Sequence, residues 1–264
     1  MSTATPTDVR LTTVEVAAGT VPGSPVRVRT RDDLLAARTL GRGVEHAEVA
    51  LVATGAVLLG GDHVTVRVHV ADGCALTLTD VGGTVAYDGE GRPCRWDVEI
   101  RLGAGARLDW EGLPFVVSTG ADVTRSTDVL LGAGARLRLR ETVVLGRDGE
   151  RGGRVVLRSS VRDDDGPLLV EEVAVAGDHP VPGVLGTQRV IDTVTDLRGG
   201  PDDGADDLDP AGEPAGGEGA VVLHLERGGT LTRWLGRSAH LSPLHRSDPV
   251  PARPSPPVAR QELV

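Results

Sequence analysis

The sequence predicts an all-β protein, folded as a β-helix-like stack of antiparallel strands and hairpins with at most two short helices. The first observation behind this prediction is a repeat. The block Leu102-Gly-Ala-Gly-Ala-Arg-Leu108 returns as Leu131-Gly-Ala-Gly-Ala-Arg-Leu137, and a fainter copy runs from Val70 to Leu76. A small-residue turn followed by an alternating strand, recurring about every thirty residues, indicates β units that bury their apolar faces by stacking.

The second observation is strand-period alternation. In His63–Val70 every second residue is valine, which places the valines on one face of a strand and Thr, Arg and His on the other. The third is the supply of turn residues, because the chain contains 36 glycines. No segment from residue 47 onward shows ten residues of convincing helical periodicity, so the all-β prediction rests on agreement between pattern and turns.

The elements follow in order along the chain. Residues 1–46 are interpreted as a lead-in, with an edge strand over 9–16 and one or two helical turns over 31–38. Residues 47–197 form the predicted β-stacked core. Its strands are expected at 48–54, 63–70, 74–79, 95–102, 106–110, 123–131, 135–145, 154–161, 168–175 and 187–194.

The C-terminal third is less regular. Residues 198–220 form an acidic insert with seven carboxylates and few apolar side chains, which predicts a flexible loop because such a segment cannot offset its own ordering entropy. Residues 221–246 are predicted to complete the same domain with a hairpin around Gly228-Gly229 and one short helix. The proline-rich segment 247–264 is predicted to be disordered.

Composition excludes several classes of protein. The net charge of −10 and the five aromatic residues argue against nucleic-acid binding, which needs a basic face or stacking platforms. The N-terminus has no apolar segment typical of a signal peptide, and the most apolar stretch, 47–61, is too short to span a bilayer. Cys74 and Cys94 are the only cysteines, so we expect a cytoplasmic protein with reduced thiols and no membrane association.

A search for catalytic motifs gives no enzyme. His63 and His69 share a strand face, yet alternation makes them ordinary solvent-facing residues. HExxH, CxxC and GxSxG motifs are absent from the sequence. The Gly-Ala-Gly segments precede strands instead of helices, and the chain contains no lysine, which excludes a phosphate-binding loop.

Carboxylates leave one alternative open. A β-solenoid carbohydrate-active enzyme would line an open groove with Asp, Glu and aromatic residues. Five aromatic residues in the whole chain make sugar recognition unconvincing, and the acids have an equally good interpretation as solvated strand faces. Spacing does not choose between the two for the candidates, which are Asp109, Glu111, Glu141, Glu171 and Glu172.

Several segments, taken together and in order, resemble the urease accessory protein D family, also called H. The resemblance covers residues 47–175 well and 221–246 loosely. The segments that carry it are Leu58-Leu-Gly-Gly-Asp62, Gly83-Thr-Val-Ala-Tyr87, the two Gly-Ala-Gly-Ala-Arg-Leu blocks, Trp110 with Pro114-Phe115, Arg140-Glu-Thr-Val-Val-Leu-Gly-Arg147 with Gly149-Glu150, and Pro167-Leu-Leu-Val-Glu171.

The resemblance implies a cytosolic, non-enzymatic chaperone. Members of the family help to deliver Ni²⁺ into the urease apoprotein together with accessory proteins F and G, and their fold is a β-helix-like stack. Ni²⁺ is then a transient cargo, and no tightly bound cofactor is expected.

Three acids match acidic positions of the family: Asp62, Glu141 and Glu171. They are the nickel-transit candidates, because isolated hard oxygen ligands bind a cation weakly and release it. The chain also departs from the family pattern. Thr79-Asp-Val-Gly-Gly-Thr84 replaces a common Thr-Thr-Gln-Ala-Ala-Thr, and a proline-rich tail replaces a C-terminal helix. A degenerate paralogue that keeps the fold without partner binding is therefore a further alternative.

Overall fold

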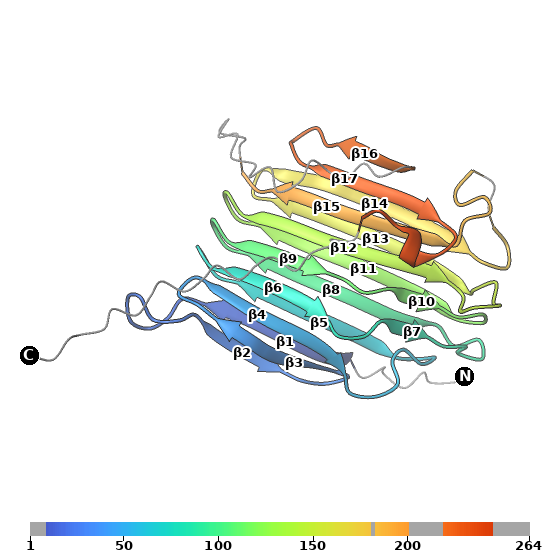
Figure 1. The fold of residues 1–264 in the computed structure, drawn as a ribbon, viewed down its shortest axis with the longest axis horizontal. Coiled ribbons are helices and arrows are strands. Elements are labelled where there is room, and N and C mark those ends of the chain that lie inside the picture. The colour runs from blue at the N-terminus through green and yellow to red at the C-terminus, as the bar shows by residue number, and fades with distance from the viewer. Residues whose placement is uncertain (1–8, 181–182, 201–218, 245–264) are drawn as a thin grey trace, which may run out of the picture.

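The structure, a computed structural model, describes residues 9–180, 183–200 and 219–244 and arranges their strands in two layers (Figure 1). Nearly all regular structure is β, and one 3-10 turn at Ala239–Leu241 is the only helical element among the described residues. The all-β, β-helix-like prediction is confirmed.

One layer is a seven-stranded sheet. Its spatial order is β14 (Gly166–Ala176), β13 (Arg154–Asp163), β11 (Asp122–Leu131), β8 (Cys94–Leu102), β5 (His63–Val70), β1 (Val9–Ala17) and β2 (Arg27–Arg31).

The other layer is a ten-stranded sheet. Its main path runs β16 (Ala220–His224), β17 (Thr230–Gly236), β15 (Val190–Arg198), β12 (Arg136–Leu145), β9 (Arg107–Glu111), β6 (Ala75–Asp80), β4 (His46–Ala53) and β3 (Leu35–Arg42). The short strands β7 (Thr84–Ala86) and β10 (Phe115–Val117) pair with each other, and β10 also pairs with the end of β12.

The pairing direction corrects the expected stack of antiparallel hairpins. Strands β1, β5, β8, β11 and β13 pair in parallel, and so do β4, β6, β9 and β12. Antiparallel pairs close both ends of the stack, as in β13–β14, β12–β15 and β3–β4. The repeat of about thirty residues carries the chain through one strand of each sheet before it returns, which makes neighbouring strands parallel.

The Gly-Ala-Gly-Ala blocks form the corner where the chain crosses from one sheet to the other. Gly73, Gly105 and Gly134 occupy the same corner in successive turns, with φ of 66°, 62° and 65°. In this left-handed region glycine carries no Cβ penalty. Their N–H groups donate hydrogen bonds to carbonyl oxygens of the neighbouring turn. The acceptors are Ala104 at 2.9 Å, Ala133 at 2.8 Å and Gly199 at 2.7 Å, in the same order.

The residue after each left-handed glycine is small and buried. Ala106 and Ala135 are fully buried there, and Cys74 occupies the equivalent position in the preceding turn. Burial raises the pKa of the Cys74 thiol, and burial together with Asp62 and Asp122 raises that of Cys94 to about 12. Both cysteines are free, and their position indicates packing roles.

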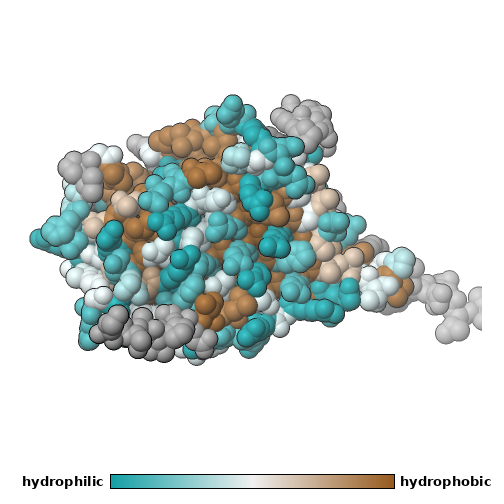
Figure 2. Space-filling view, turned by 180° about the vertical axis from the view of Figure 1, so that it is seen from behind, coloured by the Kyte–Doolittle hydropathy of each residue, from teal (hydrophilic) through white to brown (hydrophobic). Residues whose placement is uncertain are grey.

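The core lies between the two sheets and follows strand alternation. Val64, Val66, Val68 and Val70 of β5 are all fully buried, and the leucines of β6 and β9 face them in the same apolar cluster. The outward faces are mixed: hydrophilic residues spread over the broad face seen from behind, with hydrophobic residues between them (Figure 2). Arg67–Glu99 and Arg158–Glu172 are exposed ion pairs on this kind of surface.

The N-terminal segment differs from its prediction. The predicted edge strand β1 lies between β5 and β2, and its Val14 and Val16 are buried. The helical turns predicted over 31–38 are wrong, because Leu35 to Ala37 start strand β3. Asp32 accepts a hydrogen bond from the Ala37 N–H at 3.0 Å, and Leu35 to Ala37 are each at most 5% exposed, so burial against the stack overrides local helix propensity.

The C-terminal hairpin β16–β17 around Gly228-Gly229 is confirmed. Strand β15 begins at Val190, three residues after its predicted start. The predicted helix after Ser238 reduces to the 3-10 turn, within the part that the structure describes. Most of the predicted acidic insert and the whole proline-rich tail lie outside the described residues. No helix among the described residues is long and apolar enough to cross a membrane.

Candidate functional site

The inner face of the stack changes character along its length. In β12, Leu137 and Leu139 point into the interior, and the next inward position is Glu141. In β11, Val123 is followed at inward positions by Arg125 and Thr127. The later strands β14, β15 and β17 add further polar inward side chains, Glu171, Thr193, Thr195 and Arg233.

Glu141 bridges the two sheets. Its Oε1 accepts hydrogen bonds from Arg125 Nη2 and from Thr127 Oγ1, both at 2.9 Å. The Arg125 and Glu141 side chains are only 13% and 17% exposed, so the ion pair is largely shielded from water. Arg125 also lies 5.1 Å above the ring of Phe115, a cation–π contact that fixes the guanidinium against the apolar part of the interior.

Glu171 forms the second bridge between the sheets. Arg233 of β17 donates from Nη1 and Nη2 to the two oxygens of Glu171 on β14, at 2.8 and 2.6 Å. The Nε of Arg233 donates to Thr193 Oγ1 at 3.2 Å. This fork-to-fork geometry fixes both side chains more firmly than a single contact would.

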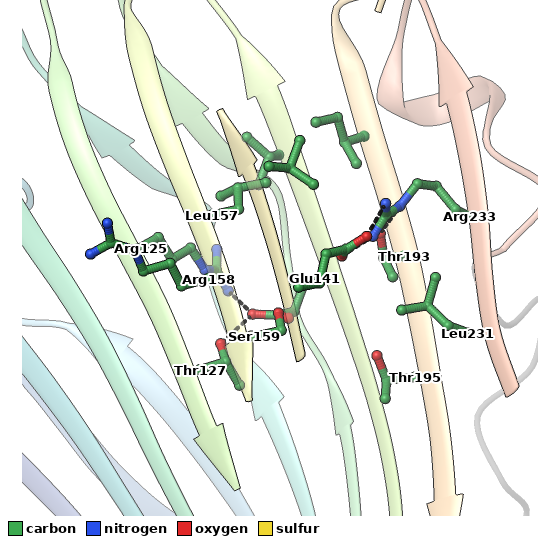
Figure 3. Close-up of a pocket in the computed structure, with 14 residues that line it drawn as sticks. Arg125, Thr127, Glu141, Leu157, Arg158, Ser159, Thr193, Thr195, Leu231 and Arg233 are labelled. Atoms are coloured by element: carbon green, nitrogen blue, oxygen red, sulfur yellow. Dashed lines mark hydrogen bonds and ion pairs between the residues drawn. The ribbon is translucent and has the colours of Figure 1, made fainter. Parts of the chain in front are cut away.

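A small cavity separates the two bridges. Its volume is about 30 Å³, which is enough for a water molecule, and Glu141 and Glu171 both line it (Figure 3). Figure 3 shows Thr193, Thr195 and Ser159 around the same space, with Leu157 and Leu231 as its apolar walls. Two of the three acids predicted as nickel-transit candidates therefore lie on one interior cavity.

A second cavity of about 20 Å³ adjoins the first, because Arg125 and Glu141 line both. Asp80 lies at its far side, where it accepts hydrogen bonds from the Leu113 N–H at 3.0 Å and from Trp110 Nε1 at 3.2 Å. Burial raises the pKa of the Asp80 carboxyl, and the two hydrogen bonds offset this only in part. Gly112 also lines this cavity and carries no side chain to fill it.

Asp62 is placed differently from the other two candidates. It closes the predicted turn before β5: its Oδ2 accepts from the Leu59 N–H at 2.7 Å, and its own N–H donates to the Leu59 carbonyl at 3.0 Å. The residues that line the two cavities do not include Asp62. The three candidates therefore do not form one cluster.

Two polar clusters lie on the outer faces. Asp97 accepts hydrogen bonds from His63 Nε2 at 2.7 Å, from Arg95 Nε and from Ser126 Oγ. His63, which was predicted to be an ordinary solvent-facing strand residue, therefore has an acidic partner. On the other sheet, Arg140 forms a bidentate pair with the fully buried Asp192 and a further contact with Glu111. Each cluster lies within one sheet. In the second, one arginine faces two carboxylates, and Glu111 Oε2 is buried without a hydrogen-bond partner.

Sequence reasoning missed the basic half of the interior. Arg125 and Arg233 occupy inward positions of their strands. In the sequence this is visible as a charged residue at a position where strand alternation places a buried valine or leucine. Asp80 carries the same signal after Leu76 and Leu78. Alternation identifies such residues only when the strand bounds are known to within one residue.

The interior chemistry suits weak, exchangeable contacts. Within the described residues, no group of three or more His, Cys, Asp or Glu side chains stands close enough to hold a metal ion. Each interior glutamate already has an arginine partner, so a cation that meets Glu141 or Glu171 must compete with a guanidinium.

Comparison with known proteins gives a consistent result. The UreD urease accessory protein family matches residues 24–242. The chain is similar to "Urease accessory protein UreD 1" of Streptomyces griseus, with 45% identity over 62% of this chain and 65% of the relative. It is 36% identical to UreD of Streptomyces coelicolor over 62% of this chain and 66% of that protein.

A third relative, UreD 1 of Saccharopolyspora erythraea, is 35% identical over 70% of each chain. The alignments with the two Streptomyces proteins span just under two thirds of those proteins' own length. The matched region includes both cavities and every strand except β1.

Proposed function

The chain belongs to the UreD family of urease accessory proteins, and from this premise we propose that it is a non-enzymatic chaperone of urease maturation. It assists the delivery of nickel into the urease apoprotein and acts in the cytoplasm, in an accessory complex with proteins F and G. The curated relatives carry the name urease accessory protein, which supports the maturation role.

One structural observation carries the nickel part of the proposal. Glu141 and Glu171 come from different sheets and from strands far apart in the sequence, yet they line the same interior cavity. Both occupy acidic positions marked by the family resemblance. Two such acids on one small cavity between the sheets support a passage, because neither solvated strand faces nor core packing requires them to meet there.

Nickel is cargo in this proposal. The ion exchanges its water ligands for one carboxylate oxygen at a time, and Arg125 and Arg233 take the carboxylates back after it leaves. Tight binding would need three or four converging ligands, which isolated acids do not supply. Asp62 has the least support of the three candidates, because its carboxylate closes a turn.

The test is co-expression with the urease subunits and accessory proteins F and G in a host that lacks its own D protein. We expect a co-purifying complex, and urease with its full nickel content and activity. Urease that reaches normal activity when this chain is omitted would overturn the proposal.

A point substitution separates nickel transit from complex formation. Glu141→Gln is expected to leave the complex intact and to lower the nickel content of urease several-fold. Glu99→Gln is the matched control, because this acid pairs with Arg67 on an exposed face and lines neither cavity. Equal nickel content in both variants would remove Glu141 from the passage.

The carbohydrate-enzyme alternative loses its main requirement. Trp96, Trp110, Phe115 and Trp234 are at most 8% exposed, and Tyr87 is half-buried, so the aromatic side chains do not form an open sugar platform. The degenerate-paralogue alternative is decided by pull-down: a chain that folds but captures neither protein F nor the apoenzyme would support it.

A further inference from the structure

The end of the stack formed by β14 and the β16–β17 hairpin is built differently from the rest. At this end the outermost strand of one sheet, β14, faces the last strands of the other (Figure 1). The larger interior cavity lies here, lined by residues of β13, β14, β15 and β17. Access to the cavity therefore depends on how firmly the two sheets are joined at this end.

The join contains two Arg–carboxylate pairs. Arg233 holds Glu171, and Arg227, in the hairpin loop, donates to Asp163 at the end of β13 at 2.9 Å. Apolar contacts between the hairpin and the main core come from partly buried Leu225 and Leu235. Leu231 is only 2% exposed, yet it joins neither apolar cluster and lines the cavity.

The two carboxylates are not equally fixed. Asp163 is almost completely buried and also accepts hydrogen bonds from the N–H groups of Gly200 and Asp165, at 3.1 and 2.9 Å. Glu171 has Arg233 as its hydrogen-bond partner, and the two side chains are 27% and 23% exposed. Water and ions can therefore compete at Glu171, whereas Asp163 stays anchored.

We propose that these contacts form a gate. The Arg233–Glu171 pair is the latch whose opening exposes the larger cavity to solvent and to small cations, and the Asp163 carboxylate, which backbone N–H groups hold, stays in place. That the gate controls the entry or exit of nickel rests on the proposed function. The opening itself is a physical property of the chain and is measured without urease or nickel.

The test uses a buried reporter cysteine. Thr195→Cys places a thiol on the cavity wall, at a position that is 6% exposed. The background is Cys74→Ala with Cys94→Val, because the repeat itself places Ala106 and Val123 at the corresponding positions of the next turn and the next strand. The probe is a cationic methanethiosulfonate reagent, and the measured quantity is the rate of labelling of the full-length folded chain.

Glu171→Gln in this background is expected to raise the labelling rate by about tenfold, the factor that corresponds to losing roughly 1.4 kcal/mol of latch stability. The matched control Glu99→Gln removes an exposed ion pair with Arg67 on the same sheet, away from both cavities, and should leave the rate unchanged. The exchanged pair Glu171→Arg with Arg233→Glu should return labelling toward the rate of the starting protein. High salt should speed labelling of the starting protein and not of Glu171→Gln.

An unchanged rate in folded Glu171→Gln, or equal acceleration by Glu99→Gln, would overturn the gate. If Glu171→Gln does not fold, the exchanged pair and the salt dependence of the starting protein decide the question. A gate that opens as expected in a chain that does not support urease activation would leave this inference standing and remove the proposed function.

Discussion

The first turns of the stack and its last turn share one backbone plan and differ in what they enclose. Between β5, β6, β8 and β9 most inward positions are buried Val, Leu or Ile, while Trp96, Trp110 and Asp80 line the second cavity. From β11 onward the same inward phase carries Arg125, Glu141, Glu171 and Arg233 around a cavity. The apolar turns therefore stabilise the fold, whereas the polar end has charged side chains and a cavity in place of apolar packing.

The charged side chains in the interior cost folding stability, so their presence is informative about function. Buried ion pairs offset their desolvation only in part, and apolar side chains of similar volume often stabilise a protein as well or better. A chain selected for stability alone would continue the valine and leucine pattern to the end of the stack. Retention of two cross-sheet ion pairs beside a cavity is the pattern expected of a functional interior.

The largest expected effect is in the apolar half. Leu78→Ala removes a fully buried side chain from β6 and should lower the free energy of unfolding by about 2–5 kcal/mol. Urea denaturation followed by far-UV circular dichroism measures the change. The neighbouring Thr79→Ala, on the exposed face of the same strand, should change stability by less than about 0.5 kcal/mol. Similar losses for both would contradict the assignment of the inward face.

The polar half should respond in two stages. Glu141→Gln leaves the Arg125 guanidinium without its charge partner and should cost about 1–3 kcal/mol of unfolding free energy. The double variant Arg125→Met with Glu141→Leu should recover most of this stability while urease activation stays low. If the apolar pair restores activation together with stability, the polar interior is structural and the comparison between the two halves fails.

The corner stack gives a smaller effect. Gly134→Ala places a side chain at φ of 65°, where an ideal Cβ meets no atom within 4 Å, so the cost is conformational and about 1–2 kcal/mol. Gly132→Ala should cost more, because its Cβ would lie 2.7 Å from the Gly103 carbonyl carbon of the neighbouring turn. Thermal unfolding of the two variants checks the order, and a smaller loss for Gly132→Ala would contradict the stacked-turn geometry.

The smallest effect is expected in the loop that links β12 to β13. Hydrogen bonds from the Arg147 side chain and N–H, and from the Thr119 N–H, lower the pKa of Glu150 to about 2, from an ordinary value of 4.5. A depressed folded-state pKa adds stability that is complete above about pH 4.5 and is lost as the pH falls through about 2.

Glu150→Gln should therefore lower Tm at pH 7 and have almost no effect near pH 2. Glu45→Gln, an exposed acid in the turn between β3 and β4, serves as the control. A Tm difference for Glu150→Gln that is independent of pH would show that the loop contacts do not depend on charge.

Much of this fold can be predicted from the sequence. Strand β5 begins and ends at its predicted residues, and the repeated Gly-Ala-Gly-Ala blocks mark the corner, because a left-handed turn at the same place in successive units needs glycine. The short strands β7 and β10 escaped prediction, since three residues are too few to show alternation. Strand β3 escaped because Leu35, Ala36 and Ala37 suit a helix as well as a buried strand.

The sequence by itself determined that the chain is a stack of β units, which family it resembles, and which acids are candidates. Local pattern suffices for these, since alternation and turn chemistry depend on residues close together in the chain. Tertiary structure alone decided that the strands are parallel, that Glu141 and Glu171 share a cavity while Asp62 closes a turn, and that Arg125 and Arg233 partner the two glutamates. Such pairings join residues 16 and 62 positions apart across two sheets, and no local signal specifies a contact of that range.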